Sequence, residues 1–272
     1  MRVMTLVKAT EDREKGPFPA AWRAGTAALG RFAARLMACA FAFLAMASAA
    51  AANPAAPYPR MAPVDAYLMD RTQEIALAKS AAPNSISKDA TILVMTGAGY
   101  ETAVTGSNGF VCWVGRGFSG ASDWAERWNP KIRAAECENP PAARSVFPIV
   151  KLRTAMLLAG RTDAETIARI KAALSSKEIP PLESGAMSYM MSKSSYLTDG
   201  GDHDMPHLMF FAAIKNGADW GANAADTPIA GVDYWFFTPG KDADAANLPP
   251  LSVFLIGVAT WSDGTPVPEH RM

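Results

Sequence analysis

The chain has 272 residues, half of them hydrophobic and 19% charged, with 26 basic and 26 acidic side chains and therefore no net charge. This length is sufficient for one substantial core or two small ones. The first 52 residues carry seven basic and three acidic side chains, so the rest of the chain keeps 19 basic and 23 acidic side chains and a net charge of −4. This mildly acidic balance argues against nucleic acid as a partner.

Residues 1–52 have the pattern of a secretory signal peptide. Three arginines precede an apolar run of eleven residues, Leu36–Met46, and small residues follow as far as Ala52. This pattern predicts cleavage after Ala49 or Ala52 and a secreted or periplasmic mature protein. An uncleaved membrane anchor is the alternative, although the run is short for a membrane span. Acidic residues ahead of the basic flank indicate a true start codon further downstream, and no later stretch is long and apolar enough to span a membrane.

The mature chain is predicted to begin with a linker and a helix. Residues 53–63 contain four prolines and are expected to form a Pro-rich linker ahead of a single domain, 64–272. From Val64 to Ala81, apolar residues recur at helical spacing, which predicts one continuous helix.

Three β-rich stretches follow this helix. Glycine-containing segments of hairpin length separate them, and such connections usually join antiparallel neighbours. The pattern predicts an antiparallel meander formed by residues 91–96, 100–105 and 110–114.

The cysteines predict one disulfide bond. Cys39 falls within the predicted signal peptide, which leaves Cys112 and Cys137, 25 positions apart. An even pair in an exported chain is typical of a disulfide, with two unrelated buried thiols as the alternative. The bond is expected to tie the last meander strand to the irregular loop after it and to stabilise the fold by roughly 3–4 kcal/mol.

The second half of the chain returns to helices and then to strands. Pro148 begins one helical pattern that ends at Gly160, and a capping box at Thr162–Glu165 opens another that Pro180 breaks. Together with the first half, this order favours an α+β domain with a largely antiparallel sheet and about three packed helices. The later strands are predicted at 186–191, 208–214, 234–237 and 252–259.

The stretch GDHDMPHLMFF, residues 201–211, contains the first candidate site. His203 and His207 are four positions apart, with Asp202 and Asp204 beside them. Imidazoles and carboxylates are common ligands of a divalent metal and common proton-transfer groups. Since an apolar strand is predicted from residue 208, His207 is expected at the lip of a pocket at the start of a central strand. A polar turn with both imidazoles solvated is the alternative.

Other candidates are less closely grouped. Glu101 and Arg144 add a carboxylate and a guanidinium to the candidate catalytic residues, although no pattern places them beside the histidines. Several methionines between 187 and 209 raise the alternative of copper binding, because thioethers bind Cu(I). The chain contains no nucleophile elbow, P-loop, dinucleotide fingerprint or haem attachment motif.

Several blocks of the sequence resemble an uncharacterised group of secreted bacterial proteins. The resemblance would span most of residues 64–262 and implies export and a single domain, but no activity. The group carries a histidine where this chain has Met205, a departure that weakens a three-histidine metal site. The blocks are NPPAARSV (139–146), GAMSYMMSK (185–193) and PHLMFF (206–211), with further similarity at 100–104 and 108–112.

Two functional hypotheses follow from the sequence. The first is a non-enzymatic envelope protein that binds a small molecule or a protein partner. The second is a hydrolase-like or metal-dependent enzyme that uses His203 and His207, with a divalent metal as its cofactor in the metal-dependent form.

Overall fold

The computed structural model describes residues 57–200, 205–214, 217–232 and 247–268. The predicted signal peptide, the strand predicted at 234–237 and the residues Asp202, His203 and Asp204 lie outside these ranges. The described part is an α+β fold built on a single, mostly antiparallel sheet of eight strands with three main helices. The predicted fold class is therefore confirmed.

The strands follow the order β2-β1-β3-β4-β5-β6-β8-β7 across the sheet. Only β1 and β3 pair in parallel; every other pair in the described part is antiparallel. The strands are β1 (Thr91–Thr96), β2 (Gly99–Val104), β3 (Val111–Gly115), β4 (Ala134–Glu138), β5 (Met187–Met190), β6 (His207–Ala212), β7 (Ile229–Val232) and β8 (Ser252–Gly257).

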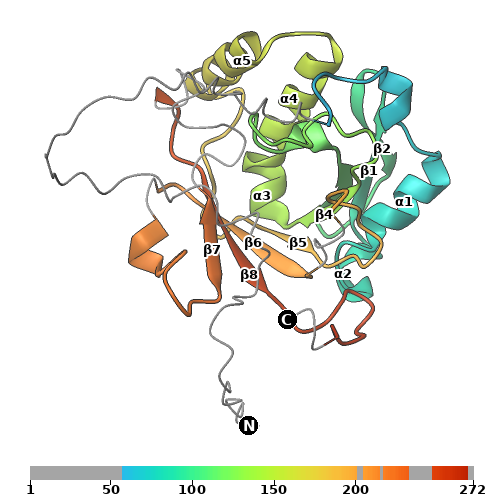
Figure 1. Ribbon diagram of the computed structural model, residues 1–272, viewed down its shortest axis with the longest axis vertical. Coiled ribbons are helices and arrows are strands. Elements are labelled where there is room, and N and C mark those ends of the chain that lie inside the picture. The colour runs from blue at the N-terminus through green and yellow to red at the C-terminus, as the bar shows by residue number, and fades with distance from the viewer. Residues whose placement is uncertain (1–56, 201–204, 215–216, 233–246, 269–272) are drawn as a thin grey trace, which may run out of the picture.

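Helices cover both faces of the sheet (Figure 1). The face under α3, α4 and α5 is called the α4 face below, and the face under α1 and α2 is called the α1 face. The helices are α1 (Arg71–Lys79), α2 (Asn84–Ser87), α3 (Pro140–Ser145), α4 (Phe147–Leu158) and α5 (Asp163–Ser175), with 3-10 turns η2 (Val64–Tyr67), η3 (Gly117–Ser119) and η4 (Gly217–Trp220).

Two apolar clusters fill the space between the helices and the sheet. Because side chains alternate along a strand, neighbouring residues of β1 and of β3 enter different clusters. The α4 face includes Leu93, Met95, Trp113, Phe147, Ile170, Met209 and Leu255. The α1 face includes Ala78, Ile92, Cys112, Val114, Ala135 and Cys137.

The predicted meander is wrong in its third strand. β1 and β2 form the expected hairpin, closed by a two-residue turn at Gly97 and Ala98. However, β3 pairs with β1 rather than with β2, and in parallel. β3 is buried at nearly every position, whereas β2 exposes Glu101 and Thr102. The apolar strand therefore takes an interior place between two neighbours, and the more polar strand forms the edge.

The predicted helix from Val64 to Ala81 is interrupted. Asp70 adopts an extended backbone, and its side chain accepts a hydrogen bond from the N–H of Gln73 at 3.0 Å. This N-cap begins α1 at Arg71 and separates it from the short turn η2. The capping box at Thr162 and Glu165 opens α5 as predicted.

The described part of the predicted linker, residues 57–63, lies against the rest of the fold. Met61 and Ala62 pack on the core of the α4 face. The N–H of Ala62 donates to the hydroxyl of Tyr67 at 3.1 Å, and the Tyr58 hydroxyl donates to Asp199. These contacts hold the segment on the fold as an ordered arm.

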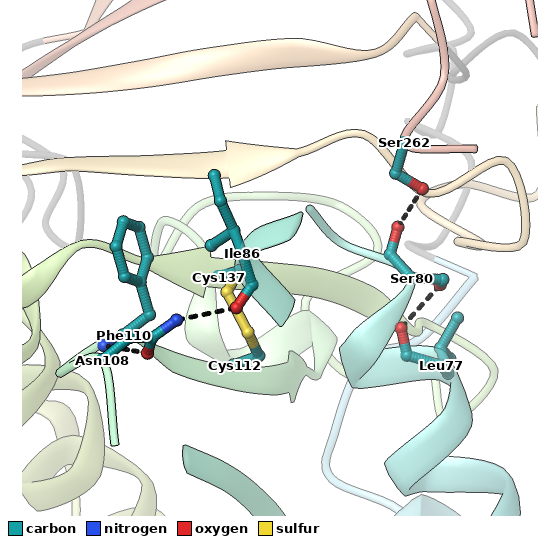
Figure 2. The surroundings of a disulfide bond; sticks show 8 residues. All are labelled: Leu77, Ser80, Ile86, Asn108, Phe110, Cys112, Cys137 and Ser262. Carbon is teal, nitrogen blue, oxygen red and sulfur yellow. Dashed lines mark hydrogen bonds between the residues drawn. A yellow bond between two sulfur atoms is a disulfide. The ribbon is translucent and has the colours of Figure 1, made fainter. Parts of the chain in front are cut away.

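The predicted disulfide between Cys112 and Cys137 is confirmed. Its expected position was wrong, since Cys137 belongs to β4 and not to a loop. The two cysteines are directly opposite each other on β3 and β4, and both are fully buried on the α1 face. Figure 2 shows Ile86 of α2 beside the sulfur atoms.

Candidate functional site

Strand β4 places two glutamates inside the protein. Cys137 points toward the α1 face, so Glu136 and Glu138 on either side of it point toward the α4 face. Glu136 is 8% exposed and Glu138 is fully buried. Two glutamates whose Cα atoms are about 6.6 Å apart along one strand therefore lie beneath α3 and α4.

The strand register adds further polar side chains to this face. Glu136 is opposite Trp113 on β3, and Glu138 is opposite Ser188 on β5. Directly paired residues in antiparallel strands have Cα atoms about 5 Å apart, so Ser188 is the nearest cross-strand neighbour of Glu138 on β5. We call Trp113, Glu136, Glu138 and Ser188 the polar row.

The polar row contains four buried atoms that have no hydrogen-bond partner in the protein. They are the indole Nε1 of Trp113, both carboxyl oxygens of Glu138 and the hydroxyl of Ser188. Only two other buried side-chain atoms in the described part of the chain share this condition, one on Glu74 and one on Arg127. A buried polar group without a partner costs about 1–3 kcal/mol, so their concentration on one face makes the polar row a candidate binding site.

Both carboxyl groups of the row favour the protonated form. Burial raises the pKa of Glu136 to about 8. Burial also raises the pKa of Glu138 well above its ordinary value; the charge of Glu136 adds to the rise, and the N–H of Phe147 opposes it. No basic side chain contributes to either shift. Within the described residues, neither carboxyl therefore has the cationic partner that buried acids usually have.

The start of α4 and a group of aromatic rings border the polar row. Phe147 is the first residue of α4, and its N–H approaches Glu138 without forming a hydrogen bond of normal geometry. The rings of Tyr100, Trp113 and Phe147 pack with centroids 5.3–5.7 Å apart. The Tyr100 hydroxyl donates its proton to the carbonyl of Val114 at 2.8 Å, so it does not donate to Glu136.

His207 begins β6, an interior strand, as predicted. It lies opposite Met190 on β5 and Gly257 on β8. Because Met209 of the same strand is packed on the α4 face, His207, two residues before it, points to that face too. The ring is buried, contrary to the alternative of a solvated imidazole. The predicted pocket at His207 stays a prediction.

The protonation of His207 follows from its contacts. Nδ1 is 2.9 Å from the carbonyl oxygen of Met205. A carbonyl only accepts, so Nδ1 carries the proton and Nε2 is the basic nitrogen of the neutral ring. Burial lowers the pKa of His207, and the bond to Met205 opposes this shift.

The remaining sequence candidates lie elsewhere. Glu101 is on the edge strand β2, five strands from β6, and forms an exposed ion pair with Arg71 at 2.6 Å. Arg144 on α3 makes two hydrogen bonds to the carboxylate of Glu183 and is 58% exposed. The structure does not bring Glu101 to His207, and Arg144 has a surface partner of its own.

A second polar cluster, around Asp199, contrasts with the polar row. The Asp199 carboxylate accepts hydrogen bonds from Tyr58, Asn129, Lys131 and Tyr196. These bonds hold the pKa of Asp199 well below its ordinary value, with Lys131 as the largest cause. Because this carboxylate is fully partnered within the chain, it ties the N-terminal arm to the fold and leaves little for a ligand to bind.

Within the residues that the structure describes, no three His, Cys, Asp or Glu side chains group closely enough to hold a metal ion. The predicted metal ligands Asp202, His203 and Asp204 lie outside that part, so the metal site predicted at His207 stays a prediction. The described helices include none with the length and apolar character needed to cross a membrane.

Sequence reasoning missed Glu136, Glu138 and Ser188. Acidic residues at alternate positions are typical of a solvent-facing side of a strand, so nothing in AAECE (134–138) indicated burial. The usable signal was the cysteine pair, because a disulfide to a residue of β3 is compatible with Cys137 on an adjacent strand. Glu136 and Glu138 would then share the face opposite the sulfur atoms.

Comparisons with known protein families, curated proteins and solved structures find no match for this chain. The function is therefore argued from the site alone.

Proposed function

We propose that the chain is an exported, non-enzymatic protein that binds a small polar molecule at the polar row. The observation that carries the proposal is the set of four buried, unpartnered atoms on Trp113, Glu138 and Ser188. A bound molecule with hydrogen-bonding groups would satisfy atoms that otherwise destabilise the fold. The buried disulfide supports export, because such bonds persist in oxidising compartments.

The test is native mass spectrometry of the protein purified from the periplasm. We expect a non-covalent adduct in the wild-type protein that disappears on denaturation. Glu138→Gln and Ser188→Ala should each reduce the adduct, because each changes a group that would contact the ligand. Glu178→Gln, which changes an exposed carboxylate on the surface, should leave it intact. A wild-type protein without any adduct, even at high protein concentration and low collision energy, would contradict the proposal.

A hydrolase-like enzyme is the second candidate. It is favoured by the protonation states on the α4 face, where Glu136 has a pKa of about 8 and a buried, neutral His207 presents Nε2 as a base. His207 is on β6, two strands from β4, so a substrate would have to bridge the two groups. Hydrolysis of p-nitrophenyl acetate tests this candidate. The native protein should hydrolyse the ester faster than heat-denatured protein does, and His207→Gln should reduce that rate. Equal rates for native and heat-denatured protein would exclude the hydrolase.

A further inference from the structure

We infer that the molecule bound at the polar row carries a cationic head, and specifically an organic ammonium group. This inference rests on the proposed function and names the ligand class that fits the same site. It begins with the composition of the row: two carboxyl groups, one hydroxyl and one indole N–H belong to residues paired across β3, β4 and β5 on one face of the sheet. Among the described residues, no basic side chain contributes to the pKa shift of either carboxyl.

When Glu138 is ionised, the unpartnered atoms are mainly acceptors. Both carboxylate oxygens then accept hydrogen bonds, and the Ser188 hydroxyl can also accept. An anionic ligand would meet two acidic groups, and only Trp113 contributes an obligate donor. A neutral ligand would leave the carboxyls protonated. An ammonium group supplies three donors and one positive charge, which matches the acceptors and replaces the missing counter-ion.

The surroundings also favour a cation. The rings of Tyr100, Trp113 and Phe147 lie along this part of the α4 face, and aromatic rings stabilise a nearby cation. An organic ammonium also places its carbon chain against the apolar side chains of the core, whereas a hydrated metal ion gains nothing from them. The described part of the chain offers too few grouped ligands for a metal, so the chemistry favours the organic ion.

Binding of this kind is coupled to proton release. The described titratable groups buried on this face or on the helix over it are Glu136 and Glu138 on β4, Tyr100 on β2, His207 on β6 and Arg153 on α4. Of these, the two carboxyls hold protons in the free protein and would lose them when the cation arrives. The affinity for an ammonium ion should therefore rise between about pH 6.5 and pH 8.

The experiment compares three probes on the mature protein: n-butylammonium, its neutral counterpart n-butanol, and CaCl2. Isothermal titration in two buffers of different ionisation enthalpy measures affinity and proton release together. We expect n-butylammonium to bind with release of protons and n-butanol to bind at least about tenfold more weakly. Glu138→Gln should lower the affinity for n-butylammonium by at least about tenfold. Glu178→Gln should change nothing.

The outcomes separate this inference from the proposed function. Equal binding of n-butanol and n-butylammonium, or unchanged ammonium binding in Glu138→Gln, would overturn the cationic head and leave a small-molecule site in place. Binding of Ca²⁺ alone would overturn the organic ion. If none of the probes binds and no adduct is found in native mass spectrometry, both the inference and the proposed function fail. A circular dichroism spectrum identical to that of the wild type shows that Glu138→Gln is folded.

Discussion

At the scale of single residues, Glu136 makes the stability of the fold depend on pH. Its pKa is about 8 in the folded protein, against 4.5 for an unperturbed glutamate, because of burial. Between these values the folded state holds a proton that the unfolded chain has lost. The free energy of unfolding therefore falls as the pH rises through this window. At about 1.4 kcal/mol per pKa unit, the loss of stability reaches up to a few kcal/mol. Glu138 acts in the same direction.

We predict that Glu136→Gln flattens this dependence. The amide cannot ionise, so the variant should gain stability over the wild type as the pH rises from about 6.5 to about 8.5. Urea unfolding at several pH values measures the difference. Staying above pH 6.5 avoids the opposite effect of His207, whose lowered pKa costs stability only at lower pH. Parallel curves for the two proteins would show that Glu136 is ionised and solvated in the folded state.

The ion pair between Arg116 and Glu74 is the described fold's most deeply buried one. Arg116 donates to Glu74 at 2.8 Å, and also to the carbonyls of Tyr67 and Val114. It thereby links α1, the turn before it and the end of β3. Glu74 therefore has a cation beside it, whereas no basic side chain of the described residues contributes to the pKa shifts of Glu136 and Glu138.

We predict that Arg116→Met destabilises the protein by about 3–5 kcal/mol, because it leaves the Glu74 carboxylate buried without its counter-ion. The double variant Arg116→Met with Glu74→Met should lose less than the single variant. Chemical denaturation of both proteins measures the two free energies. If the double variant were less stable than Arg116→Met, the unpaired Glu74 carboxylate would not be the cause of the destabilisation.

At the scale of secondary-structure elements, the disulfide secures β4 against β3. Cys112 and Cys137 are paired in register, and the backbone of β4 carries Glu136 and Glu138 on its other face. The cross-link therefore fixes the strand that positions the polar row. It also closes a connection of irregular structure between the two strands.

We predict that Cys112→Ser with Cys137→Ser destabilises the protein by about 3 kcal/mol, the value expected for a loop of this length. Urea unfolding of the oxidised wild type and of the double variant tests the magnitude. In the wild type, thiol labelling under denaturing, non-reducing conditions should find no reactive cysteine in the mature chain. Two labelled cysteines would show that the bond is not formed in the protein as isolated.

The sequence predicted elements whose signals are local. The capping box of α5, the hairpin between β1 and β2 and the apolar run of β6 were all recognisable within a few residues. β4 was missed, because its two glutamates are typical of an exposed strand and their burial depends on α4, which lies outside the local pattern. The parallel pairing of β3 with β1 was missed for the same reason, since nothing in either strand alone specifies its neighbour.

At the scale of the whole molecule, the two faces of the sheet have different chemistry. The α1 face is apolar and carries the disulfide, whereas the α4 face combines the larger apolar cluster with the polar row. The sequence predicted the cysteine pair of the first face from composition. It did not predict the polar row, because the row is assembled from β3, β4 and β5, which are distant in sequence.

We predict that the mature protein begins between residues 50 and 53. The apolar run that ends in small residues supports cleavage there, and the arm that begins at residue 57 packs on the fold through Tyr58 and Met61. Intact mass of the protein recovered from the periplasm measures the start. A mass that retains residues 1–49, or that includes a lipid, would contradict cleavage at this position.

The central claim is that the polar row binds a molecule from outside the chain. A high-resolution crystal structure of the mature protein, purified from the periplasm without added ligand, tests it most directly. The account predicts ordered density that is not water within hydrogen-bond distance of a Glu138 carboxyl oxygen and of the Ser188 hydroxyl. Density for water alone, or a Glu138 side chain paired with a basic residue of the same chain, would contradict it.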